Sequence, residues 1–222
     1  MSYRLRLLAF AIGTLAVLFC LNIAFSALNT IGRLDMVEAE RDQWQRPAAI
    51  IQALALKPRS VVADLGCGSG YFTLKLGAAV GAGGHVVAED IRRESLIFLR
   101  IRSVLRQERN ISIIRGDLND PHLPARVNSV LIVNTYHEFT DARSMLVHVY
   151  DSLLPSGRLV IVDRAPGSDG NPAPEPVRHE ISADQVDSDL RQAKFDLLDR
   201  QNHFISSDPN HEDWWLIVAR KP

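Results

Sequence analysis

The amino-acid sequence predicts an α/β fold in which helices cover both faces of a mostly parallel sheet. Three observations support this prediction. From Val61 onward, short apolar runs that fit buried strands alternate with longer segments that fit helices. The first apolar run leads directly into a glycine-rich turn, a junction typical of parallel sheets. Near the carboxyl terminus, two apolar runs follow each other with no helix between them, which indicates a closing pair of strands.

Each element can be assigned in order from its local pattern. Pro47 suits the first position of a helix, and Lys57-Pro58 ends that helix. A turn at Pro155-Ser156-Gly157 opens the fifth strand, Ser182 caps the last helix, and the proline- and glycine-rich stretch 166–177 is a loop. Beyond the first helix we expect strands at 61–65, 83–91 (with its turn), 111–117, 127–133, 157–164, 195–204 and 214–221, and helices at 71–80, 94–107, 142–154 and 182–193.

An apolar run precedes this domain. Leu7–Leu28 contains no charged residue, and as a helix it would be about 33 Å long, enough to cross the core of a bilayer. We favour an uncleaved membrane anchor, because the run is longer than the core of a typical signal peptide. The alternative is a cleaved signal with Arg4 and Arg6 as its basic region and Ala24-Phe25-Ser26 as its cleavage site, which would leave a secreted or periplasmic protein.

The sequence therefore divides into three parts. Residues 1–32 form the anchor or signal segment, 33–46 a charged connector that is compatible with a helix, and 47–222 the folded domain. The topology of the anchor stays open, because arginines lie on both sides of the apolar run.

Composition argues against several kinds of partner. The net charge is −1 and no block of basic residues occurs, so the chain lacks the electrostatic footprint of a nucleic-acid binder. Only two cysteines occur, Cys20 in the apolar run and Cys67 in the glycine loop. They provide neither a disulfide framework nor a metal site, so no metal is expected.

The stretch "VVADLGCGSGYFT" (Val61–Thr73) predicts a ligand cradle. Glycine lets a ligand lie directly on backbone N–H groups at a strand-to-helix junction. Gly66, Gly68 and Gly70 have the spacing G-x-G-x-G, which differs from the G-x-G-x-x-G of pyrophosphate binders. Asp64 just before them suits a cationic ligand and repels a phosphate. Cys67 is a small residue within the turn, with a redox role as the alternative; the whole stretch could also be a structural turn.

Two further acids follow strands. Asp90 lies at the tip of the second strand, about twenty residues past the loop, where an acid can accept hydrogen bonds from both hydroxyls of a ribose. Glu89 is expected on the opposite side of that strand, as a solvated or packing charge. Asp117 in "RGD" lies just beyond the third strand, within reach of an adenine amino group, or it is a plain turn acid.

Taken together, "VADLGCGSGYF", "VVAEDI", "IRGDL" and "LLPSGRLVIVD" resemble the class I S-adenosylmethionine-dependent methyltransferases from about residue 47 to the end. The resemblance implies a seven-stranded sheet whose last strand is antiparallel. It also implies that Asp64 and the three loop glycines hold the methionyl and ribose part of S-adenosylmethionine. Asp90 would then bind the ribose hydroxyls and Asp117 the adenine.

The fourth strand ends in "NTYHEF", Asn134 to Phe139. This is not the N-P-P-[YF] of many nitrogen methyltransferases, and it is similar to a variant found in a subgroup of small methyltransferases. Asn134 is assigned to the cofactor side. His137 could take a proton from a hydroxyl group with Glu138 orienting it and Tyr136 nearby. Alternatively, His137 and Glu138 cap the next helix and Tyr136 packs in the core.

Arg178 and His179 follow the proline-rich loop, where this fold usually builds its acceptor pocket. The sequence as a whole predicts a membrane-anchored methyltransferase that acts on a hydroxyl group or activated carbon of a small molecule. A membrane-soluble acceptor would give the anchor a purpose. The alternatives are a non-catalytic S-adenosylmethionine-binding module and, against the glycine spacing, a nicotinamide-dependent oxidoreductase.

Overall fold

The structure is a computed structural model that describes residues 3–167, 180–206, 208 and 212–222. It divides into two compact units, Met1–Arg41 and Asp42–Pro222.

The first unit consists of one helix. α1 runs from Tyr3 to Trp44 without a break, so its last residues already belong to the second unit. Within it, Ile12–Trp44 is long and apolar enough to cross a membrane, a criterion that a signal sequence near the amino terminus also meets. The helix continues through the point at which the sequence suggested a change from anchor to connector.

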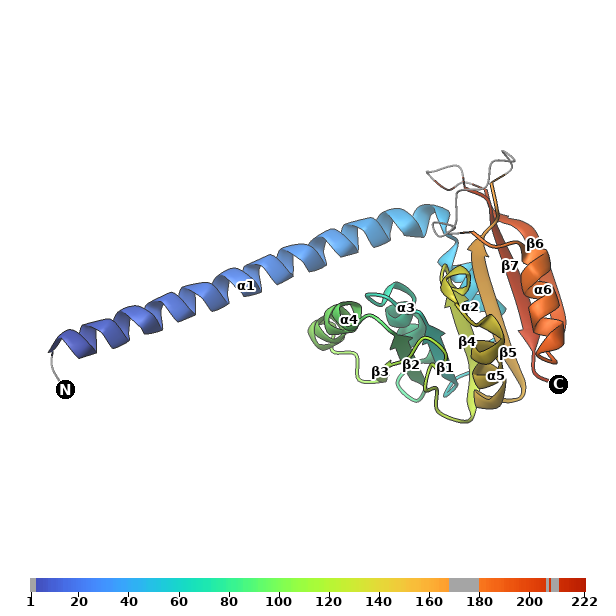
Figure 1. Cartoon of the computed structure of the whole chain (residues 1–222), viewed down its shortest axis with the longest axis horizontal. Coiled ribbons are helices and arrows are strands. Elements are labelled where there is room, and N and C mark those ends of the chain that lie inside the picture. Colours follow the sequence, from blue (N-terminus) through green and yellow to red (C-terminus); the bar gives the residue numbers. More distant parts are fainter. Residues whose placement is uncertain (1–2, 168–179, 207, 209–211) are drawn as a thin grey trace. The chain divides into compact units, whose positions relative to one another are not determined.

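The second unit is built on a seven-stranded sheet with the strand order β3-β2-β1-β4-β5-β7-β6 (Figure 1). Neighbouring strands among the first five are parallel, whereas β7 is antiparallel to both β5 and β6. The prediction of a mostly parallel sheet with an antiparallel last strand is therefore confirmed. The strands are β1 (Val61–Leu65), β2 (His85–Asp90), β3 (Ile111–Arg115), β4 (Val127–Val133), β5 (Leu153–Arg164), β6 (Asp196–Ile205) and β7 (Trp214–Arg220).

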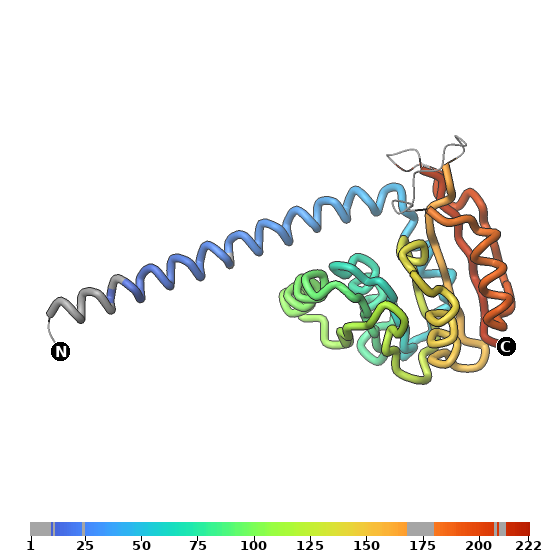
Figure 2. Tube along the Cα trace, in the orientation of Figure 1, coloured from blue at the N-terminus to red at the C-terminus, as the bar shows by residue number. Residues whose placement is uncertain are grey.

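Helices cover both faces of this sheet, and Figure 2 follows the chain through them. One face packs against α2 (Pro47–Ala53), α3 (Tyr71–Val80) and α4 (Arg93–Leu105). The other face packs against α5 (Ala142–Ser152) and α6 (Ala183–Gln192), and a short 3-10 turn, η1 (Tyr136–Glu138), precedes α5. The alternation of strand side chains sends Trp214 to the first face and Trp215 to the second, as the sequence indicated.

Two element boundaries differ from the prediction more than the others do. β5 begins at Leu153, so Pro155, Ser156 and Gly157 lie within the strand and not in a turn before it. Val127 pairs with Leu153 and Ser129 with Arg158, and the extra residues form an irregularity in the ladder. A proline and glycine in sequence favour a turn, but the residues on either side pair with β4, and the Ser156 N–H donates to the Lys221 carbonyl at 2.9 Å. α2 ends at Ala53, before the predicted end at Lys57.

The parallel part of the sheet brings acidic residues to one edge. Asp64 is the second-last residue of β1, Asp90 is the last residue of β2, and Asp163 is the second-last residue of β5. All three are buried. Because the carboxyl ends of parallel strands meet at the same edge, this is the place where a ligand site is expected.

A substitution at Trp215 measures how much packing on the α6 side of the sheet contributes to the free energy of unfolding. Its ring is 1% exposed, and its Nε1–H donates to the Ile181 carbonyl at 2.8 Å. Trp215→Ala is expected to lower the free energy of unfolding by about 3–5 kcal/mol, because it leaves a large cavity. Urea unfolding followed by circular dichroism would measure this loss. Leu198→Ala, at a half-exposed position on β6, should change stability by less than about 0.5 kcal/mol; equal effects of the two substitutions would contradict the packing described.

Candidate active site

A cavity opens at the carboxyl edge of β1, β2, β3 and β4. The open space at this edge, including the solvent at its mouth, is about 490 Å³. Of the predicted cofactor residues, this cavity brings together Gly66, Asp90 and Asp117. The complete lining is Gly66, Glu89, Asp90, Ile91, Arg92, Asp117, Leu118, Thr135, Glu138, Phe139 and Met145.

The glycine loop has the backbone that its sequence requires. Gly66, Gly68 and Gly70 all have positive φ, which side chains resist. A Cβ atom on Gly66 would run into the side chain of Thr135, and one on Gly70 would run into Leu99. Arg102, a buried residue of α4, donates from Nη1 to the Ser69 carbonyl at 2.7 Å and so holds the loop from below.

Asp64 lies beneath the loop. Its side chain is 3% exposed, and Oδ2 accepts a hydrogen bond from the hydroxyl of Thr73 at 2.6 Å. Burial raises the pKa of Asp64 to about 6, and the nearby charge of Asp90 adds to the increase, whereas the Thr73 hydrogen bond opposes it. The ionised form is thus disfavoured until a positive charge comes close.

Asp90 connects the loop to the start of α4. Its Oδ2 accepts from the Gly68 N–H at 2.8 Å, and its Oδ1 accepts from the Arg92 N–H at 2.7 Å. The Arg92 Nε lies 3.5 Å from Oδ1. Asp90 therefore fixes the shape of the glycine loop as well as lining the cavity.

Glu89 was predicted to lie on the opposite side of β2 as a solvated or packing charge, and the structure shows that it also lines the cavity. It is 3% exposed, it lines the cavity, and its Oε2 accepts from the Gly66 N–H at 3.4 Å. Its Oε1 is buried and makes no hydrogen bond within the described residues. Burial is the main cause that raises the pKa of Glu89 to about 7, and the charge of Asp90 contributes. The strand alternation did send Glu89 to the face opposite Asp90, but the loop after β1 closes over both faces.

Asp117 lies at the mouth of the cavity with a largely exposed carboxylate. The His122 Nε2 is 2.9 Å from its Oδ2, and the other ring nitrogen of His122 is 3.2 Å from Asp120. The hydrogen bond to Asp117 is the main cause that raises the pKa of His122.

The ends of β4 and β5 hold a buried pair that the sequence analysis found only in part. His137 has a side chain that is 2% exposed, and its Nδ1 lies 2.8 Å from Oδ1 of Asp163. The backbone N–H of His137 donates to Oδ2 of Asp163 at 3.2 Å. Asp163 was missed as a site residue, although it follows an apolar strand just as Asp64 and Asp90 do. This shared pattern was the available signal.

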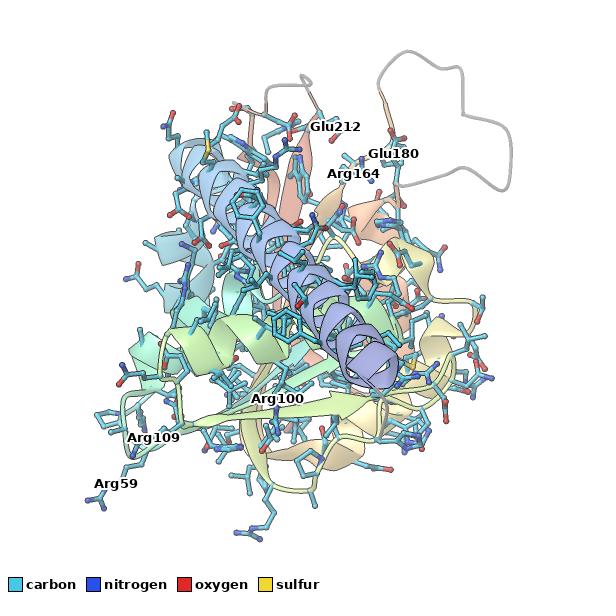
Figure 3. All side chains as sticks on the ribbon, turned by 90° about the vertical axis from the view of Figure 1, so that its left-hand side faces the viewer. Arg59, Arg100, Arg109, Arg164, Glu180 and Glu212 are labelled. Carbon is cyan, nitrogen blue, oxygen red and sulfur yellow. The ribbon has the colours of Figure 1, made fainter. Side chains whose placement is uncertain are left out.

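Arg164 follows Asp163 but has different partners. Its Nη1 lies 2.9 Å from Oε1 of Glu212, and the two labels lie near each other in Figure 3. Its guanidinium group also lies over the ring of Trp214.

Of the remaining predicted site residues, some line the cavity and others lie away from it. Glu138 lines the cavity, with its Oε1 3.9 Å from the His137 Nε2. Tyr136 packs in the core, and its hydroxyl donates to Asp189 at 3.0 Å, so it is separated from the cavity lining. Asn134 has positive φ and a buried Oδ1 that makes no hydrogen bond within the described residues. Cys67 is buried, which raises the pKa of its thiol. Arg178 and His179 lie outside the described residues.

A comparison with protein families identifies the domain. The methyltransferase domain family matches residues 56–216, nearly three quarters of the chain. The chain belongs to this family. It is an S-adenosylmethionine-dependent methyltransferase, and S-adenosylmethionine is its cofactor.

Known proteins agree with this assignment. The ubiquinone/menaquinone biosynthesis C-methyltransferase of Wigglesworthia glossinidia brevipalpis is 26% identical over 121 residues, which cover 51% of this chain and 46% of that protein. The chain thus matches about half the length of this relative. Among solved structures, an S-adenosylmethionine-dependent methyltransferase from Aquifex aeolicus has a TM-score of 0.69 at 20% identity, covering 79% of this chain and 89% of the other. The phosphoethanolamine N-methyltransferase 2 of Haemonchus contortus, solved with S-adenosylmethionine, has a TM-score of 0.67 at 14% identity, covering 81% of this chain and 53% of the other. These two likenesses concern the fold.

The residues of the cavity fit this cofactor. Gly66 lies so close to Thr135 that no side chain fits there, so bare backbone forms this part of the cavity wall. The buried Oε1 of Glu89 is a hydrogen-bond acceptor without a donor among the described residues. Burial, together with the nearby negative charge of Asp90, raises the pKa of Asp64 and Glu89 and so disfavours the ionised forms of these two carboxyls. A cationic ligand relieves this repulsion. No group of three or more potential metal ligands occurs among the described residues.

The raised pKa of Glu89 predicts how stability depends on pH. The pKa rises from 4.5 in an unfolded chain to about 7 in the fold, so the folded state binds more protons between these values. The contribution of Glu89 is fully present below about pH 4.5 and is lost as pH rises through about 7. Glu89→Gln should therefore be more stable than the wild type above pH 7, by about 3 kcal/mol at most. Urea unfolding at pH 5 and 8 measures the difference. Asp151→Asn, at an exposed position on α5, is the control and should leave the pH dependence unchanged.

The same acids predict a preference for the charged form of the cofactor. S-adenosylmethionine carries a positive sulfonium that S-adenosylhomocysteine lacks, and Asp64 and Glu89 ionise through about pH 6 and 7. The affinity ratio between the two ligands should therefore shift toward S-adenosylmethionine as pH rises from 5.5 to 8. Calorimetric titration with each ligand at both pH values tests this. A ratio that is independent of pH would show that these carboxyls do not sense the sulfonium.

Proposed function

We propose that this protein transfers the methyl group of S-adenosylmethionine to a hydroxyl oxygen, or to a carbon activated by a hydroxyl, of a small membrane-soluble acceptor. The observation that carries the proposal is the buried pair His137–Asp163, which adjoins Glu138 of the cavity lining. Methyl transfer itself needs mainly positioning, so a base is useful only where the acceptor must lose a proton. Such a base points to a hydroxyl acceptor, because a neutral amine attacks through its lone pair before it loses a proton.

The pair defines a direction for the proton. Asp163 accepts from the Nδ1–H of His137, which leaves the lone pair on Nε2, the nitrogen on the side of Glu138. His137 takes the proton of the acceptor hydroxyl at Nε2, and the electron pair of the broken O–H bond serves the new bond to the methyl carbon. When bound, S-adenosylmethionine supplies an electrophilic methyl group on its sulfonium, and the bonding pair stays on sulfur. Asp163 then stabilises the imidazolium that forms.

Two observations support a membrane-soluble acceptor. The similar protein from Wigglesworthia is named as a C-methyltransferase of ubiquinone and menaquinone biosynthesis. In addition, Ile12–Trp44 meets the length and hydropathy criteria for a membrane span, and we propose that it serves as an anchor. A hydroxylated quinone precursor with an apolar tail combines these features, because its ring offers both a hydroxyl and an activated carbon.

The acceptor class can be tested with a labelled methyl group. Full-length protein and S-adenosylmethionine with a deuterated methyl are incubated separately with the lipid extract and the aqueous extract of the same cells. We expect mass spectrometry to find a labelled product only in the lipid extract. Labelled product in the aqueous extract alone would overturn the membrane-soluble acceptor, and labelled amines would overturn the role of the base.

The proposed base gives a separate prediction. His137→Ala should lower kcat by about 10²–10⁴-fold, and Asp163→Asn should lower it as well, because general-base assistance has this magnitude. Both variants should still bind S-adenosylhomocysteine with the affinity of the wild type. The pH profile of kcat should lose its lower limb in His137→Ala, an effect that a structural role would not produce. Full activity in both variants would exclude the pair from the reaction.

A further inference from the structure

The outer side of α4 carries a regular stripe of basic and apolar residues. Arg93, Ile97, Arg100 and Val104 follow one another in steps of four, three and four, which places all four on one side of a helix. All four are exposed. This set of residues is the α4 stripe.

The apolar members of the stripe are not needed for folding. α4 already packs on the sheet through the buried residues Leu96 and Leu99, which are not part of the stripe. Within the described residues 42–222, seven large apolar side chains are exposed. Three of them, Ile97, Val104 and Leu105, lie on α4, and Ile91 lies immediately before it. Exposed apolar groups are therefore concentrated here, as expected at a surface with a partner.

The charges of the stripe are available to a partner. Neither Arg93 nor Arg100 makes a hydrogen bond or an ion pair within the described residues. Glu94 is the one acid of α4, so Arg93 and Arg100 leave the exposed side of this helix with an excess of positive charge.

We propose that the α4 stripe docks the domain onto the surface of an anionic lipid bilayer. A helix with alternating arginine and apolar residues on one face suits the boundary between lipid headgroups and acyl chains. There the arginine stems lie along apolar material while their guanidinium groups bind lipid phosphates. Binding to a nucleic acid would leave the apolar side chains of Ile97 and Val104 largely in contact with water. A nucleic acid is therefore disfavoured as the partner. The apolar segment Ile12–Trp44 independently makes a bilayer the surface this chain would meet.

Docking would have a consequence for the active site. Ile91 and Arg92 line the cofactor cavity and directly precede α4. A bilayer in contact with the α4 stripe therefore lies near the cavity mouth. This interface is independent of the methyl acceptor, because the stripe contains no residue assigned to binding or catalysis.

A fluorescent label on α4 tests the docking in the full-length protein. The variant with Cys20→Ser and Val104→Cys is labelled at residue 104 with nitrobenzoxadiazole. The variant with Cys20→Ser alone is treated in the same way and shows how much label the buried Cys67 takes up. The protein is reconstituted into nanodiscs of phosphatidylcholine alone or of phosphatidylcholine with phosphatidylglycerol. We expect a blue shift of the label's emission only with the anionic lipid, and a smaller shift at high salt.

Charge reversal then identifies the contact. One basic charge near an anionic surface is worth about five-fold in affinity, so Arg93→Glu with Arg100→Glu should weaken docking by at least about 25-fold and abolish the shift. Arg126→Glu with Lys194→Glu makes the same change of charge at exposed positions outside α4 and should keep the shift. Binding of S-adenosylhomocysteine confirms that each variant is folded. Equal emission in both lipids, a shift that survives the α4 reversal, or a loss that is equal in both pairs would overturn the proposal.

Discussion

Buried carboxyl groups at the carboxyl edge of the sheet are the constraint on which the rest of the site depends. Asp64, Glu89 and Asp90 are each at most 3% exposed, and each accepts a hydrogen bond from the glycine loop or from the helix that follows it. Removing carboxylates from water is costly unless donors or positive charge compensate for it. The loop amides compensate in part, and the sulfonium of the cofactor is the charge that this edge still lacks. The same three carboxyl groups therefore stabilise the glycine loop and are positioned to bind the cofactor.

The two sides of the sheet contribute different functions. On the side of α3 and α4, Asp64 and Asp90 shape the loop and connect it to Thr73 and Arg92. On the side of α5 and α6, Glu89 lines the cavity, and the His137–Asp163 pair adjoins Glu138 of the lining. This division follows from strand alternation, since neighbouring residues of a strand point to opposite faces. A methyl donor held from one side and an acceptor activated from the other can meet above the edge of the sheet.

The two sides of α4 have different roles in the domain. α4 supports the glycine loop from within through Arg102, while its outer side carries the α4 stripe. One helix therefore connects the cofactor loop to the surface proposed to contact lipid. Its inner residues are explained by packing, and the proposed lipid contact would explain its outer arginines and apolar residues.

The sequence by itself determined the parallel sheet, the glycine loop and most element boundaries, because hydrophobic period and glycine spacing are local properties. β4 was predicted with its observed bounds, and Ser182 caps α6 through the Gln185 N–H as expected. The tertiary structure decided what depends on distant partners. Glu89 is buried under Gly66, Asp163 pairs with His137 across two strands, and pairs with β4 on either side of Pro155 keep it within a strand. The tertiary structure also placed Tyr136 in the core. Burial and pairing between residues far apart in the chain set these outcomes, and no local pattern records them.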